Sequence, residues 1–136
     1  AIENVLTTLR GIAPKRLVML FGAGGDRDRK KRPIMGKLSA DIADFVIVTS
    51  DNPRTEDPMS IIEEILPGVR AGKAPYKVIC DRPEAIRWAI DHHEPGDVIL
   101  LCGKGHEDYQ IIGHEKIHMD EREIVADYLA ERAKRT

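Results

Sequence analysis

The sequence has few of the features that place a protein in a membrane, in an oxidising compartment or on nucleic acid. Its 136 residues include two cysteines and 4% aromatic residues, and the formal net charge is −2. No apolar run approaches the roughly 20 residues that cross a bilayer, and no signal peptide opens the chain. A net charge near zero provides no basic field for nucleic acid. We therefore expect a cytoplasmic protein that binds neither nucleic acid nor a membrane.

The two cysteines favour a reduced protein rather than a disulfide-linked one. Cys80 and Cys102 each close an apolar run, so we expect them to be core thiols. The length fits one domain, covering residues 1–136. Because the chain starts at Ala1 and passes directly into a helical pattern, we expect a fragment of a longer protein.

Several well-known catalytic motifs are missing. There is no Gly-x-x-x-x-Gly-Lys-Ser/Thr loop, and therefore no Walker-type phosphate cradle. Gly22-x-Gly24 follows a predicted strand as a dinucleotide loop would, yet Arg27 stands where that fingerprint has Gly or Ala. The five histidines show no zinc spacing, and no Ser-His-Asp or Cys-His pairing is visible. We expect no metal site and no covalent catalysis in this chain.

What the chain does contain is a regular alternation of strands and helices. Continuous apolar runs, typical of strands buried on both faces, lie at 17–21, 45–49, 78–80 and 98–102. Helices are expected to open at Pro33, Asp57–Pro58 and Pro83. A hairpin at 110–118 and a last helix after Asp120 follow. The pattern predicts an α/β fold: a Rossmann-like, doubly wound, mostly parallel sheet with a C-terminal β-hairpin and a final helix.

The periodicity also predicts which helical side chains are buried. The apolar positions expected to face the sheet in the second and third helices are Ile34, Leu38, Ile42, Ile61, Ile62, Ile65 and Leu66.

Three polar segments leave strands at the same edge of this predicted sheet. They are residues 22–32, 50–57 and 103–109. Because the carboxyl ends of parallel strands share one edge, where ligands bind in such folds, we expect the three segments to converge.

The side chains on two of these segments suit the two charged groups of an amino acid. Asn52 and Arg54 flank Pro53, which stiffens the turn, and together they offer donors for a carboxylate. Glu107 and the carbonyl of Gly103 offer acceptors for an ammonium group. The alternatives are an ordinary Asx-Pro turn with a solvated arginine, and a surface glutamate on a flexible loop.

Three motifs, in this order, resemble a known family. They are Gly-Gly-Asp-Arg-Asp-Arg-Lys-Lys-Arg-Pro, Asp-Asn-Pro-Arg-Thr-Glu-Asp-Pro and Gly-Lys-Gly-His-Glu-Asp-Tyr-Gln. Together they resemble the C-terminal domain of the Mur ligases, specifically of those that add meso-diaminopimelate to UDP-N-acetylmuramoyl-L-alanyl-D-glutamate (UDP-MurNAc-L-Ala-D-Glu). The resemblance covers essentially the whole chain.

The resemblance implies a part of a bacterial, cytoplasmic, three-domain ligase that makes an amide bond in peptidoglycan synthesis. Such ligases use ATP and Mg²⁺, whose principal sites lie in another domain, so the isolated chain is expected to be inactive. The implied roles are Asn52 and Arg54 for the distal carboxylate of diaminopimelate, Gly103 and Glu107 for its distal amino group, and Arg27 for the carboxylate beside the reacting amine. The full set of implied substrate-binding residues is Arg27, Asp51, Asn52, Pro53, Arg54, Gly103 and Glu107, with no catalytic residue among them.

A further point follows from the resemblance. Arginine at position 54 favours diaminopimelate over L-lysine, because relatives that add lysine usually carry another residue there. The basic residues 29–32 are expected to form a solvated loop in this chain, and the alternative is that they face the nucleotide phosphates in the full enzyme. Two other functions stay open from the residues alone: a stand-alone Rossmann-like module that binds a nucleotide or small molecule, and a non-catalytic interaction domain.

Overall fold

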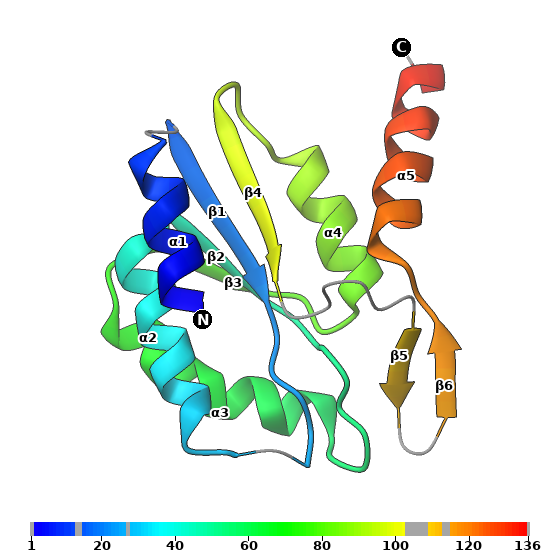
Figure 1. The fold of residues 1–136 in the computed structure, drawn as a ribbon. Helices are drawn as coiled ribbons and strands as arrows, with labels where there is room; N and C mark the ends of the chain where they lie inside the picture. The colour runs from blue at the N-terminus through cyan, green and yellow to red at the C-terminus, as the bar shows by residue number, and fades with distance from the viewer. Residues whose placement is uncertain (1, 13–14, 27, 103–108, 113–114, 136) are drawn as a thin grey trace.

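A computed structural model describes residues 2–12, 15–26, 28–102, 109–112 and 115–135. At its centre is a four-stranded parallel sheet with strand order β3-β2-β1-β4 (Figure 1). The strands are β1 (Arg16–Phe21), β2 (Phe45–Val48), β3 (Tyr76–Val78) and β4 (Asp97–Cys102). The parallel sheet predicted from the apolar runs is confirmed.

Helices cover both faces of the sheet, as a doubly wound fold requires (Figure 1). On one face lie α1 (Ile2–Gly11), α2 (Lys31–Ile42) and α3 (Pro58–Ala71). On the other lie α4 (Arg82–Asp91) and α5 (Glu121–Arg135). The predicted hairpin forms from β5 (Tyr109–Ile112) and β6 (Glu115–His118), which pair antiparallel as a separate sheet.

Helix α3 follows the sequence prediction closely. Asp57 is its N-cap residue and Pro58 its first residue. All four apolar positions predicted to be buried, Ile61, Ile62, Ile65 and Leu66, are buried. Among the helices described, none is both long and apolar enough to cross a membrane.

Helix α2 differs from its prediction in both its start and its buried face. It begins at Lys31, two residues before Pro33. Ile34 is 58% exposed, whereas Gly36 and Ala40 are buried. Leu38 and Ile42, also predicted to be buried, are only half-buried.

The cause is a close crossing of α2 and α3. A Cβ added to Gly36 would lie 2.5 Å from the carbonyl oxygen of Ile65, and one added to Gly68 would lie 1.8 Å from that of Pro33. Only small residues fit between backbones this close, so Gly36 occupies the crossing and Ile34 lies at the surface.

The third strand is displaced by two residues from its predicted position. β3 ends at Val78, and Cys80 follows it with its carbonyl oxygen accepting hydrogen bonds from the Ser50 amide (3.3 Å) and the Thr49 hydroxyl (3.2 Å). Cys80 and Cys102 are free thiols, each half-buried. Burial raises the pKa of the Cys80 thiol, which keeps it protonated.

Candidate functional site

Two loops from neighbouring strands meet at the carboxyl edge of the sheet. Residues 22–26 leave β1, and residues 49–57 leave β2. The Gly25 amide donates to the Asn52 carbonyl at 2.7 Å, and Arg54 Nη1 donates to the Gly25 carbonyl at 3.0 Å. The predicted convergence is therefore confirmed for these two segments. The third segment, with Gly103 and Glu107, lies outside the described residues, as does Arg27.

The two loops are in such close contact that a side chain cannot be added between them. A Cβ on Gly25 would lie 1.8 Å from the carbonyl oxygen of Pro53, and one on Gly22 would lie 2.4 Å from that of Thr49. Real Cβ atoms do not approach other atoms this closely. Glycine is thus required at both positions by space, which fixes the distance between the loops.

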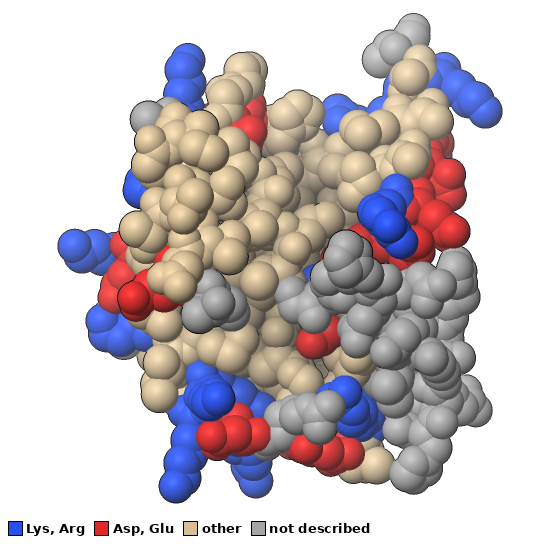
Figure 2. Space-filling view, viewed as in Figure 1, with Lys and Arg blue, Asp and Glu red and all other residues tan. Residues whose placement is uncertain are grey.

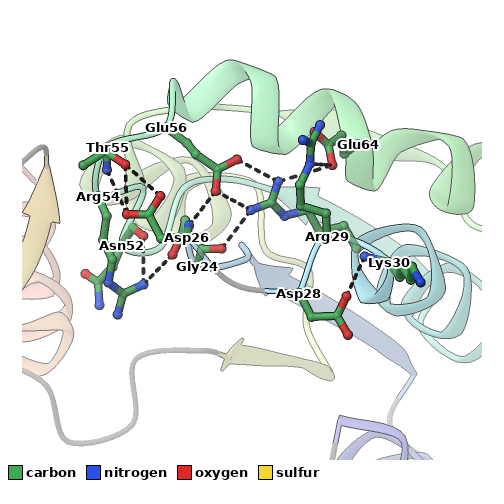
Figure 3. A network of polar contacts seen from close by, with 12 residues as sticks. Gly24, Asp26, Asp28, Arg29, Lys30, Asn52, Arg54, Thr55, Glu56 and Glu64 are labelled. Carbon is green, nitrogen blue, oxygen red and sulfur yellow. Dashed lines mark hydrogen bonds and ion pairs between the residues drawn. The ribbon is translucent and has the colours of Figure 1, made fainter.

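Each loop also holds one residue in the left-handed region of backbone space. Asp26 has a φ of 56° and Arg54 a φ of 53°, and no other non-glycine residue in the described part of the chain has a positive φ. The Thr55 hydroxyl donates to the Asp26 carboxylate at 2.7 Å, and this hydrogen bond links the two loops (Figure 3). The left-handed conformation costs roughly 1–2 kcal/mol per residue, and such strain is typical of functional sites.

Arg54 is held by one end of its guanidinium group. Its Nη1 donates to the carbonyl oxygens of Gly25 and Asn52, at 3.0 and 3.4 Å. Within the described residues, Nε and Nη2 make no hydrogen bond. In Figure 3 the guanidinium group lies at the opposite end of the network from Arg29 and Glu64. Nε and Nη2 of this half-buried arginine are donors of the kind that pair with carboxylates in proteins.

The other predicted residues of this turn have structural roles as well. Asn52 is 3% exposed. Pro53 is buried and its carbonyl oxygen accepts the Glu56 amide at 3.0 Å, which closes a tight turn. Asp51 is half-buried at the start of the turn.

Behind the turn, Arg32 forms a buried ion pair, and the prediction of a solvated basic loop is wrong for this residue. Arg32 is 1% exposed and contacts both oxygens of Glu56, at 2.8 and 3.1 Å. It also donates to the Gly24 carbonyl at 3.1 Å and to Glu64 at 3.3 Å. As the second residue of α2, it points inward, and a buried charge needs such partners.

The remaining basic residues of this segment are exposed, as predicted. Arg29 pairs with Glu64 at 2.6 Å, and Lys30 and Lys31 are exposed. Figure 2 shows acidic and basic side chains gathered together along the lower edge of the molecule. Charges of opposite sign therefore lie side by side, and the lower edge of this face has no uniformly basic surface.

Glu56 connects the buried arginine to the strained loop. Its carboxylate accepts the hydrogen bonds from Arg32 and also one from the backbone amide of Asp26. The hydrogen bond from Arg32, followed by that from the Asp26 amide, lowers the pKa of Glu56 from 4.5 to about 2. The sequence did not predict this role, although Glu56 belongs to the motif Asp-Asn-Pro-Arg-Thr-Glu-Asp-Pro. The pairing with Arg32 spans 24 positions and has no local signal.

No group of three metal-ligating side chains occurs within the described ranges. The turn around Arg54 offers hydrogen-bond donors of the kind that an anion accepts.

A comparison with protein families gives a match of the family described as Mur ligase, glutamate ligase domain, over residues 1–105. The chain belongs to this family. The resemblance that the three motifs indicated is confirmed.

Individual relatives support the same family. The chain is 55% identical over 134 residues to the UDP-N-acetylmuramoyl-L-alanyl-D-glutamate–2,6-diaminopimelate ligase of Trichormus variabilis, covering 98% of the chain and 27% of the relative. It is 52% identical over 133 residues to the ligase of the same name from Caldanaerobacter subterraneus, covering 98% and 28%. A solved structure of a ligase of that name superimposes with a TM-score of 0.89 and 39% identity, covering 96% of this chain and 27% of that one. The chain thus spans about a quarter of the length of these relatives.

Proposed function

We propose that this chain is the amino-acid-binding part of an ATP-dependent ligase that adds meso-diaminopimelate to UDP-MurNAc-L-Ala-D-Glu in peptidoglycan synthesis. The observation that carries the proposal is the anchored Arg54, in a member of a family whose relatives include diaminopimelate ligases. Since the chain spans about a quarter of those relatives, we assign the activity to a longer protein.

The contribution of this chain is to orient the amino acid. Arg54, with Asn52 beside it, binds the distal carboxylate of diaminopimelate through the donors that the Gly25 contact leaves available. Arg27 binds the second carboxylate, and Gly103 and Glu107 bind the distal amino group. Fixing both ends of the substrate directs its free amine towards the accepting carboxyl group. Such orientation lowers the activation free energy by several kcal/mol when the geometry is correct.

The same arrangement explains a preference for diaminopimelate over L-lysine. Lysine has no distal carboxylate, so its binding would cover Arg54 without supplying a partner. Burying a polar group without a hydrogen bond costs about 1–3 kcal/mol, and more when the group is charged. A site built to bind a substrate group rejects an analogue that lacks it.

Activation of the accepting carboxylate is assigned to ATP and Mg²⁺ in other parts of the longer ligase. The sequence has no Walker-type loop, and the described residues have no cluster of metal ligands.

Titration of the protein with meso-diaminopimelate and with L-lysine, followed by NMR, tests the proposal. We expect meso-diaminopimelate to shift the signals of Arg54, Arg27 and Glu107 and L-lysine to leave them unchanged. Arg54→Ala should weaken binding of meso-diaminopimelate by roughly 10- to 100-fold, in line with a charged hydrogen bond. Saturable nucleotide binding that is indifferent to Arg54→Ala would instead identify a nucleotide-binding module. The 136-residue chain alone is expected to form no amide bond.

A further inference from the structure

A second buried arginine, Arg82, lies under the same edge of the sheet and is not part of the site described above. It is the first residue of α4 and is 0% exposed. Its three nitrogens donate in three directions: Nε to Glu121 at 2.8 Å, Nη1 to the Ser50 carbonyl at 3.0 Å and Nη2 to the Cys102 carbonyl at 2.8 Å.

The two carbonyl acceptors mark the points where two strands end. Cys102 is the last residue of β4, and Ser50 lies just beyond β2 and directly before Asp51. β2 and β4 are not neighbours, because β1 runs between them. Arg82 therefore joins the ends of two strands that share no ladder of hydrogen bonds.

The chemistry of the guanidinium group suits this task. It is planar and rigid, and it remains charged at any physiological pH, so its three donors hold their acceptors at a fixed spacing. Glu121, nearly buried at the start of α5, neutralises the charge at 2.8 Å. A buried ion pair of this kind often adds little net stability compared with apolar residues of the same volume. We therefore attribute the role of Arg82 to the spacing that it imposes on the Ser50 and Cys102 carbonyl groups.

We propose that Arg82 is a positioning residue that sets the separation between the turn bearing Asn52 and Arg54 and the point where the chain leaves β4, and thereby sets selectivity for the amino acid. The inference rests on the proposed function. A substrate with charged groups of both signs is discriminated by the spacing of the groups that bind it. A displacement of about 1 Å, even when caused far from the reacting atoms, lowers rates by as much as about 100-fold.

The test uses the full-length ligase that contains this chain, with Arg82→Lys as the variant. Lysine keeps the charge, but its compact ammonium group cannot reach three acceptors lying in three directions. The matched control is Arg16→Lys. Arg16 is the first residue of β1, at the edge of the sheet opposite to the site, and it contacts Asp97, the first residue of β4, at 2.7 Å. It also donates to the carbonyl oxygen of His92, at the end of α4, at 3.1 Å.

We measure kcat/KM for meso-diaminopimelate, L,L-diaminopimelate and L-lysine, together with the thermal unfolding midpoint. Arg82→Lys is expected to lower kcat/KM for meso-diaminopimelate by roughly 10- to 100-fold and to reduce its preference over the other two amino acids. Arg16→Lys is expected to change stability and to leave that preference unaltered.

A second variant covers the case in which Arg82→Lys does not fold. Arg82→Met combined with Glu121→Leu removes both charges, so no unpaired buried charge remains. Loss of preference in this folded double variant supports the inference. Unchanged preference in a folded variant, alongside a wild-type enzyme that prefers meso-diaminopimelate, overturns the inference alone. A wild-type enzyme that does not use meso-diaminopimelate overturns the proposed function and the inference with it.

Discussion

Replacing Gly25 by alanine should disable the site while leaving the fold in place. The added Cβ would lie 1.8 Å from the Pro53 carbonyl oxygen and 2.5 Å from its carbon. Both of those atoms belong to backbone, so no flexible side chain can move aside. The loops after β1 and β2 must separate, and the hydrogen bonds from the Gly25 amide to Asn52 and from Arg54 to the Gly25 carbonyl are then lost or lengthened.

The size of the effect follows from the distance. To restore an ordinary contact, the loops must open by more than roughly 1 Å. Inserting a methyl group into a closely packed region costs about 1–3 kcal/mol of stability, which a protein of ordinary stability tolerates. The same displacement moves the Arg54 guanidinium away from its substrate position, and we expect kcat/KM for meso-diaminopimelate to fall by about 100-fold.

Two other glycines provide controls for this prediction. Gly68→Ala creates a clash of the same closeness, 1.8 Å from the Pro33 carbonyl oxygen, but at the crossing of α2 and α3. Gly11→Ala, at the end of α1, has no atom within 4 Å of its added Cβ. Urea unfolding and steady-state kinetics are measured for all three variants. If Gly25→Ala lowers activity no more than Gly68→Ala at equal folded fraction, the argument from loop contact is refuted.

Three further predictions concern the residues around the turn. Arg54→Gly should be more stable than Arg54→Ala by about 1 kcal/mol in urea unfolding, because glycine adopts a positive φ without strain; equal stability would show that the backbone is not strained. The pKa of Glu56 is lowered from 4.5 to about 2. Its ion pair with Arg32 therefore stabilises the fold at pH values above 4.5, and this stability is lost as the pH falls from 4.5 towards about 2. In the Glu56→Gln variant the free energy of unfolding should therefore change less with pH between about pH 5 and pH 2 than in the wild type. An unchanged pH dependence would show that Glu56 does not titrate with a lowered pKa. Arg32→Met should cost about 3 kcal/mol because it leaves Glu56 without its main partner, and adding Glu56→Gln should recover part of that loss; a purely additive double variant would show that the two residues do not interact.

The fold was largely predictable from the sequence where one or both faces of an element are apolar, with α2 as the exception. The parallel strands and the buried face of α3, with Ile61, Ile62, Ile65 and Leu66, follow from local periodicity. The convergence of the loops bearing Gly25 and Arg54 was predictable too, because the carboxyl ends of parallel strands share one edge.

The errors fall where distant backbone contacts override local pattern. In α2 the periodicity of Ile34, Leu38 and Ile42 indicated a buried stripe, yet close approach to α3 requires small residues and turns Ile34 to the surface. Arg32 was expected to be solvated because it ends a basic run. Its burial depends on Glu56, and no local rule relates positions that far apart.

The contacts around Arg54 form one series of hydrogen bonds that begins at the buried residue Arg32. Buried Arg32 fixes the Glu56 carboxylate, and that carboxylate holds the backbone amide of Asp26. Asp26 is the next residue after Gly25, whose carbonyl oxygen anchors Arg54. The strain at Asp26 and Arg54, roughly 1–2 kcal/mol each, is offset by charged hydrogen bonds worth about 1.5–3 kcal/mol each. The position of Arg54 therefore depends on Arg32 and Glu56. If the proposed function is correct, substitutions at Arg32 or Glu56 should weaken binding of meso-diaminopimelate without contact with the substrate.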